Sequence, residues 1–343
     1  MKRIALCSPF FALSVFFAAA QQKYEPAADV YAAGLEIALD GNGVACYWKN
    51  GVKTALTDGR YSAWADAIAV SGSDVYVAGW EWNAAGKDVA CYWKNGMKTA
   101  LSDGRYNAGA MAIAVSGSDV YTAGSEANAA GKQAAWYWKN GVKTALTDGR
   151  YEAGAAAIAV SGSDVYAAGY EANAAGNREA CYWKNGVKTV LTDGGYHAYA
   201  AAITVSGSNV YAAGWERNAA DKQAAWYWKN GVKTALTDGR YKAYAEAIAV
   251  SGSDVYAAGA EENAAGKAVA CYWKNGVKTV LTDGGYEAVA KAIAVSGSDV
   301  YVAGVETIAD FKYVACYWKN GVKTTLPDIG SYVDVLAMAL DLR

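Results

Sequence analysis

The pentapeptide Tyr47-Trp48-Lys49-Asn50-Gly51 occurs seven times in this chain of 343 residues, and each copy begins 45 residues after the previous one. Its tryptophans are Trp48, Trp93, Trp138, Trp183, Trp228, Trp273 and Trp318. A repeat of this length with several short strand-like runs is typical of one propeller blade, and seven such units are enough to close a ring. The sequence therefore predicts an all-β fold, a seven-bladed β-propeller.

The second repeat shows how one blade is built. Four runs rich in apolar residues cover 67–71, 74–79, 89–94 and 97–101, and we name them strands A to D. Gly72-Ser73 separates A from B, and Asn95-Gly96 separates C from D. Both pairs favour two-residue hairpin turns because these residues accept positive φ. Each blade is therefore predicted to be a four-stranded antiparallel sheet.

The two ends of the chain are predicted to share one blade. The first repeat begins with strand B at Asp29 and has no strand A before it. The carboxy-terminal run 336–340 falls on the register of strand A, 45 residues after 291–295. We therefore expect the carboxy-terminal strand to complete the first blade, which removes two open sheet edges from the ring.

The amino terminus resembles an export signal. Met1-Lys2-Arg3 is followed by an apolar run and by small residues up to Ala20, which predicts a secretory signal peptide over 1–20 with cleavage after Ala20. Residues 21–343 then form a single propeller domain that is secreted or periplasmic. The apolar run is too short to cross a bilayer and no other segment comes close, so no membrane span is expected.

Charge and cysteine usage restrict the partners. The chain has 31 basic and 33 acidic residues, and removal of Lys2 and Arg3 makes it more acidic, so nucleic acid is not an expected partner. Five cysteines share one repeat position, where equivalent sites lie about 10 Å apart at a radius of roughly 12 Å, beyond the reach of a disulfide. We expect buried free thiols, no metal, no cofactor and a monomer. These cysteines are Cys46, Cys91, Cys181, Cys271 and Cys316.

The repeats resemble those of the highly repetitive secreted bacterial β-propellers, whose units read roughly VYVAG, then YWKNG, then LTDG. The resemblance covers residues from about 29 to 340. It implies the propeller fold and export. It implies no activity, because that of such proteins is unassigned.

Variation among the repeats indicates where function lies. Strand alternation places the A–B and C–D turns at one end of the ring, which we call the constant face. The B–C and D–A connections lie at the other end, the variable face, and hold most of the differences between repeats. Extra Trp and Tyr rings with a few charges are what a sugar or peptide site uses. The candidate ligand-binding residues at the channel mouth on this face are Trp64, Asp66, Trp80, Trp82, Tyr170, His197, Tyr199, Trp215, Arg217, Tyr244, Glu246 and Lys291. The alternative is that these rings only cover loop ends.

Two sets of charges recur in every repeat. A glutamate ends each strand B, as at Glu36, and an aspartate starts each D–A connection, as at Asp58. The glutamates form either a ring that holds a cation or, as we expect, ion pairs with residues of the Lys87 or Arg60 type. Each aspartate is expected to accept hydrogen bonds from its own turn. Lys49 and Lys53, with their repeats, are predicted to be solvated edge charges.

Three functions remain open from the sequence. A non-catalytic propeller that binds a glycan, peptide or protein is favoured, because His197 is the single histidine and no cysteine or histidine cluster accompanies it. The chain is therefore predicted not to be an enzyme. One alternative is a glycoside hydrolase or lyase that uses channel-mouth carboxylates such as Asp66 and Glu246. The other is a structural protein of the cell envelope or surface.

Overall fold

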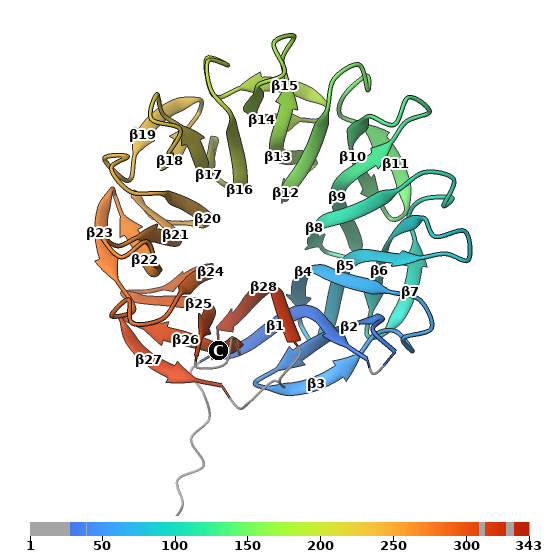
Figure 1. Ribbon diagram of the computed structural model, residues 1–343, viewed down its shortest axis with the longest axis horizontal. Coiled ribbons are helices and arrows are strands. Elements are labelled where there is room, and N and C mark those ends of the chain that lie inside the picture. Colours follow the sequence, from blue (N-terminus) through green and yellow to red (C-terminus); the bar gives the residue numbers. More distant parts are fainter. Residues whose placement is uncertain (1–27, 39, 309–312, 327–332, 343) are drawn as a thin grey trace, which may run out of the picture.

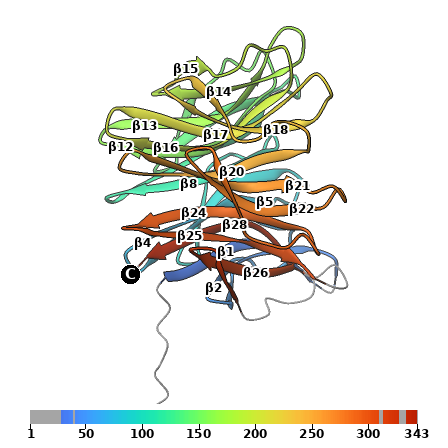
Figure 2. The same cartoon turned by 90° about the vertical axis from the view of Figure 1, so that its left-hand side faces the viewer.

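The computed structural model describes residues 28–38, 40–308, 313–326 and 333–342. Seven four-stranded antiparallel sheets surround a central channel, which confirms the predicted seven-bladed propeller (Figure 1). The innermost strands, such as β8, β12 and β24, run from one face of the ring to the other (Figure 2). No helix among the residues described is long and apolar enough to cross a membrane. The predicted signal peptide lies outside the described residues.

Strands A to D occupy the same places in every blade, from the channel outward. Strand A is β4 (Ala63–Ser71), β8 (Ala108–Ser116), β12 (Ala153–Ser161), β16 (Ala198–Ser206), β20 (Ala243–Ser251), β24 (Ala288–Ser296) and, for the first blade, β28 (Val333–Leu342). Strand B is β1 (Ala28–Ile37), β5 (Asp74–Trp82), β9 (Asp119–Ala127), β13 (Asp164–Ala172), β17 (Asn209–Arg217), β21 (Asp254–Glu262) and β25 (Asp299–Thr307). Strand C is β2 (Gly43–Lys49), β6 (Asp88–Lys94), β10 (Gln133–Lys139), β14 (Arg178–Lys184), β18 (Gln223–Lys229), β22 (Ala268–Lys274) and β26 (Tyr313–Lys319). Strand D is β3 (Val52–Ala55), β7 (Met97–Ala100), β11 (Val142–Ala145), β15 (Val187–Val190), β19 (Val232–Ala235), β23 (Val277–Val280) and β27 (Val322–Thr325).

The chain closes its own ring. β28 pairs antiparallel with β1, from Ala28 opposite Leu342 to Glu36 opposite Val333. The sheet order β28-β1-β2-β3 therefore joins the two ends of the chain in blade 1, as predicted. Closure therefore gives blade 1 an innermost strand, as in the other six blades.

The hairpin turns also agree with the sequence. Asn95 and Gly96 have φ angles of 48° and 85°, and Gly72 has 59°. The Asn95 side chain supports its turn, because Oδ1 accepts a hydrogen bond from the Val75 N–H at 2.9 Å. The constant face is thus built from turns whose chemistry repeats.

Tryptophans of strand C fill the gaps between blades. All seven are at most 1% exposed. Trp93 of blade 2 packs against Tyr31, Ala33 and Ala45 of blade 1, and Trp48 of blade 1 packs against blade 7 in the same way. The apolar contacts between neighbouring blades are therefore continuous around the ring. The five cysteines of the described chain are free and buried, as predicted.

A bulge in strand A directs one residue of each of blades 2 to 7 into the channel. In blade 2, Ala65 pairs with Gly79 and Ala67 pairs with Ala78, so Asp66 has no partner in the ladder. The same skip occurs at Met111, Ala156, Ala201, Glu246 and Lys291, and all six residues line the channel. At a β-bulge, the residue that is left unpaired can direct its side chain differently from its neighbours on the strand. In blade 1, the residue skipped in the pairing is Leu336.

The repeated glutamates have different partners from those predicted. Glu36 pairs with Lys53 of strand D in its own blade, and Glu171 pairs with Lys188 at 2.8 Å, rather than with residues of the Lys87 or Arg60 type. Lys49 also has a partner, Asp29, at 3.0 Å. Lys49 and Lys53 are thus solvated, as predicted, with side chains 47% and 44% exposed, but each also has an ion-pair partner that was not predicted. Lys53 reaches Glu36 because a lysine side chain is long enough to extend across strand C. The aspartate prediction is confirmed, since Asp58 Oδ1 accepts from the Arg60 N–H at 2.9 Å.

Candidate ligand-binding site

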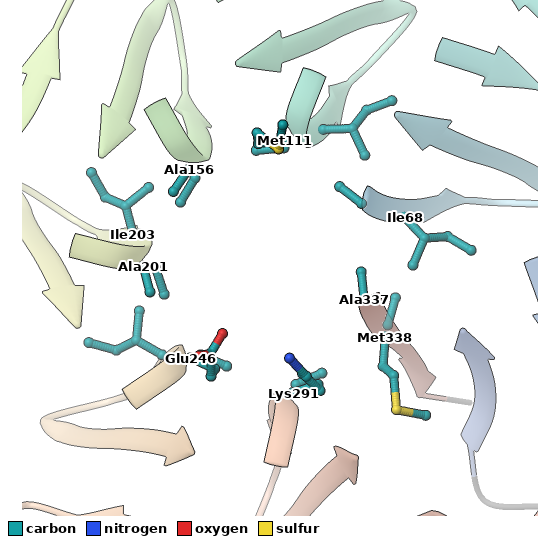
Figure 3. A pocket seen from close by; sticks show the side chains of 18 of the residues that line it. Ile68, Met111, Ala156, Ala201, Ile203, Glu246, Lys291, Ala337 and Met338 are labelled. Carbon is teal, nitrogen blue, oxygen red and sulfur yellow. The ribbon is translucent and has the colours of Figure 1, made fainter. Parts of the chain in front are cut away.

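The channel is a cavity of about 570 Å³ along the ring axis. Its wall contains an isoleucine from each of six strands A, as at Ile68 and Ile203, and the six bulge residues (Figure 3). Of the bulge residues, Glu246 and Lys291 lie on neighbouring blades, whereas Ala201 and Ala156 on the two blades before them are uncharged (Figure 3). The channel is therefore asymmetric although its scaffold repeats.

Asp66 is the bulge residue with the most unusual surroundings. Its Oδ2 atom is buried and has no hydrogen-bond partner among the residues described. Burial raises the pKa of the Asp66 carboxyl to about 7 from an ordinary value of 3.8, because the charged form is poorly solvated there. Asp66 can therefore carry a proton near neutral pH.

A second cavity of about 650 Å³, which we call the side cleft, lies on the variable face and is lined mainly by blades 4 and 5. It is formed by the B–C connections of blades 3 and 4, by the D–A connections on either side of blade 4 and by the end of β17. Three of the predicted residues line it: His197, Trp215 and Arg217.

A row of three aromatic rings joins the side cleft to the channel. Tyr199 and Trp215 are register partners on β16 and β17, and their ring centroids are 6.1 Å apart at 23°. Tyr170 on β13 approaches Tyr199 with centroids 5.8 Å apart at 40°. Trp215 lines the side cleft and Tyr199 lines the channel, so the row of rings extends from one cavity to the other.

Arginines at the cleft are held by their neighbours. The Arg178 guanidinium lies 4.4 Å from the centre of the Tyr170 ring, a cation–π distance. The backbone N–H of Arg178 donates to His197 Nδ1 at 3.1 Å, which fixes this nitrogen as an acceptor. Arg217 donates through Nη1 to Asp221 Oδ1 at 2.6 Å.

Asp221 occupies a strained backbone position. Its φ is +58°, at a position where the equivalent B–C connections of blades 2, 3, 4 and 6 have glycine. A non-glycine residue with this φ costs on the order of 1 kcal/mol. The ion pair with Arg217 offsets part of that cost, so the loop and the arginine hold each other in place.

The remaining charged residues of the cleft are Lys132 and Glu152. Lys132 Nζ donates to the Arg150 carbonyl at 2.9 Å, and Glu152 Oε2 accepts from the Gln133 N–H at 3.2 Å. The cleft is therefore lined by three basic side chains, Lys132, Arg178 and Arg217, and by one acidic side chain, Glu152.

The other predicted residues are distributed as follows. Asp66, Tyr199, Glu246 and Lys291 line the channel. Trp64 and Trp80 stack on each other, with centroids 4.2 Å apart at 14°, and Trp80 also lines a small cavity of about 150 Å³. Trp82 is 41% exposed and donates through Nε1 to Asp88 at 2.7 Å. Tyr244 is half-buried, and burial raises the pKa of its hydroxyl.

Sequence reasoning missed Lys132, Tyr151, Glu152 and Arg178, although all four line the side cleft. A signal was present, because the position of Arg178 differs in other blades, as at Asp88, Gln133, Gln223 and Ala268. The signal was overlooked because this position stands at the start of strand C, whose Tyr-Trp-Lys sequence is the same in every repeat. Within the described part of the chain, no group of three or more His, Cys, Asp or Glu residues has a geometry that fits a metal ion.

No family model and no curated protein matches this chain. Among solved structures, a puromycin-hydrolyzing peptidase from Mycobacterium tuberculosis matches with a TM-score of 0.59 at 13% identity, over 88% of this chain and 52% of the peptidase. This chain thus spans about half the length of that peptidase. These likenesses show the propeller fold.

Two further structures match over almost their whole length. The β-propeller domain of the Trilobed protease from Pyrococcus furiosus has a TM-score of 0.55 at 9% identity, over 88% of this chain and 95% of that domain. The BP39L lectin from Burkholderia pseudomallei has a TM-score of 0.50 at 12% identity, over 87% of this chain and 94% of the lectin. At these identities the match extends to the fold and no further.

Proposed function

We propose that this protein is a non-catalytic binding propeller whose ligand is a glycan held in the side cleft. The observation that carries the proposal is the aromatic row Tyr170–Tyr199–Trp215 beside a cavity of about 650 Å³. A cavity of this size is within the range of small-ligand sites, and rigid rings offer contact area at low entropic cost. The BP39L lectin has a propeller of similar fold, so a scaffold of this kind is compatible with glycan binding.

The repeated scaffold supports the choice of the side cleft. Tyr170 and Trp215 occupy the same repeat position, which holds Ser125 in blade 3 and Ala260 in blade 6. Only where blades 4 and 5 meet do two neighbouring blades both carry a ring there and a third ring, Tyr199, between them. The other blades form the same fold without this cluster of rings, so the fold does not require it.

The test is a screen of the purified protein against immobilised glycans, followed by titration calorimetry with any glycan that binds. The Trp215→Ala change should weaken binding at least tenfold, because it removes the ring that flanks the cleft. Trp80→Ala is the matched control, since Trp80 holds the same register position in blade 2. Equal affinity of wild type and Trp215→Ala for a bound glycan would refute the site.

A second candidate, a glycoside hydrolase or lyase, is favoured by one observation. The raised pKa of Asp66 is a property of a general acid, and Glu246 supplies a second carboxylate in the same cavity. Release of reducing sugar from a polysaccharide by the wild type, but not by Asp66→Asn, would favour this candidate. Absence of release by the wild type would leave the binding proposal in place.

A further inference from the structure

We infer that the side cleft selects a saccharide that carries a carboxylate, an acidic sugar, over a neutral one. This inference rests on the proposed function and names the ligand class of the same site. It follows from the sign and placement of the charges in the cleft.

The charge of the cleft is opposite to that of the molecule. The chain as a whole has a formal net charge of −2. The cleft has three basic side chains against the carboxylate of Glu152 and that of Asp221, which pairs with Arg217. Local excess positive charge in a partly enclosed site attracts an anion, because solvent screens it less than at an open surface.

The other blade junctions provide an internal comparison. Three positions supply Lys132, Arg178 and Arg217 to the cleft of blades 4 and 5. The corresponding sets are Asn42, Asp88 and Ala127 for blades 2 and 3; Lys87, Gln133 and Ala172 for blades 3 and 4; Asn177, Gln223 and Glu262 for blades 5 and 6; and Lys222, Ala268 and Thr307 for blades 6 and 7. Each of these sets contains at most one basic residue. The scaffold therefore does not require the three charges, and their convergence marks one junction.

The two arginines keep hydrogen-bonding capacity for a ligand. Arg178 enters no ion pair with the residues described and is held over Tyr170 by a cation–π contact. Arg217 uses Nη1 for Asp221, which leaves its Nη2 donors without a partner among the described residues. A guanidinium has five donors in a planar fork that matches a carboxylate. Both arginines are thus oriented with donors to spare.

Aromatic rings at the same cleft favour a sugar as the carrier of the carboxylate. Trp215 and Tyr151 both line it and are half-buried, so each exposes part of a ring. A sugar ring has a flat apolar side that packs on such surfaces, while its carboxylate reaches the arginines. An acidic peptide has the same charge without this flat side.

The experiment compares three probes by titration calorimetry at low salt: trigalacturonate, its methyl ester and triglutamate. The ester keeps the saccharide shape and removes the charge. We expect trigalacturonate to bind at least about tenfold more tightly than the ester, because charge-assisted hydrogen bonds to the arginines are lost with the carboxylates. Raising the salt concentration should reduce this preference.

Variants test whether the two arginines cause the preference for trigalacturonate over its methyl ester. Arg178→Gln should reduce this preference to less than about threefold. Arg217→Gln combined with Asp221→Gly should do the same, since the glycine restores the residue that other blades use in this loop. Arg105→Gln is the control, because it removes one positive charge from an exposed side chain outside the cleft.

The outcomes separate the inference from the proposed function. Equal binding of acid and ester, both lost in Trp215→Ala, would overturn the inference and leave the glycan site standing. Binding of neither saccharide would overturn both. Tighter binding of triglutamate than of trigalacturonate would also overturn both, in favour of an acidic peptide.

Discussion

Replacement of Gly214 by alanine should lower the stability of the propeller by straining the sheet of blade 5. Gly214 lies opposite Ala200 in the register, beside the bulge that frees Ala201. A Cβ at Gly214 would lie 1.9 Å from the Tyr199 carbonyl oxygen and 3.0 Å from the Ala200 Cα. Equivalent glycines meet the same obstacle, as at Gly79, where the distance to the Trp64 carbonyl oxygen is also 1.9 Å. Glycine is therefore required by the bulge and not by an unusual φ.

The magnitude follows from this geometry. Relief of the overlap requires β16 and β17 to separate locally by about 1 Å, which strains the ladder on both sides of the bulge. Overpacking of this kind costs about 1–3 kcal/mol, and a weakened backbone hydrogen bond adds about 1 kcal/mol. We expect Gly214→Ala to lower the free energy of unfolding by about 3 kcal/mol.

Urea denaturation followed by tryptophan fluorescence measures this effect as a lower midpoint with an unchanged slope. Gly195→Ala is the matched control, because its Cβ would meet no atom closer than Asp193 Oδ1 at 3.4 Å. A Gly214→Ala protein that unfolds within about 0.5 kcal/mol of the Gly195→Ala protein would refute the reasoning.

Three further predictions concern the core, the channel and the closure of the ring. Trp183→Ala should lower the free energy of unfolding, measured by urea denaturation, by about 3–5 kcal/mol. Trp183→Phe should lower it by only about 1 kcal/mol, because this change also removes a buried Nε1–H that has no partner among the described residues. Equal losses for the two variants would contradict this reasoning. The raised pKa of Asp66 favours its protonated form in the folded state, so the folded protein should lose stability as pH rises from about 4 to about 7. Asp66→Asn should therefore be more stable than wild type at pH 8, by about 1–3 kcal/mol, and equally stable near pH 4, as measured by urea midpoints at the two pH values; a difference that is the same at both would show that titration of Asp66 is not its cause. Deletion of residues 335–343 removes most of β28 and exposes the inner edge of β1, so thermal melting should occur at least about 10 °C lower, and melting like the full-length chain would argue against closure.

The ring and its closure were predictable because each rests on local sequence or on register. Asn95-Gly96 specifies a turn by itself, and the 45-residue offset carries the register from one repeat to the end of the chain. Such features need no knowledge of which residues meet across space.

The bulge could not be predicted in the same way. Ala65, Asp66 and Ala67 stand between other small or apolar residues, so strand A lacks the alternation that would reveal a skipped position. The partner of Glu36 was missed because Lys53 lies two strands away in the sheet. Both features depend on how the sheet is paired, and spacing along the chain does not show it.

The candidate site was predicted in part. Tyr199 and Trp215 were found because they interrupt the repeat, and the structure shows that their rings meet. The contact of Arg178 with His197 was not found, since 19 residues separate them and only the D–A connection to the next blade brings them together. Loops from successive blades jointly form the side cleft, whereas each repeat read alone shows only one wall of it.

The bulge in strand A has a consequence for how this molecule can change. Because Asp66, Glu246 and the other bulge residues stand outside the ladder of hydrogen bonds, a substitution there replaces the channel lining and leaves the pairing of the blade intact. The chain thus has one nearly independent lining position in each of blades 2 to 7. Libraries that vary these positions together would redesign the channel without changing how the strands of each blade pair.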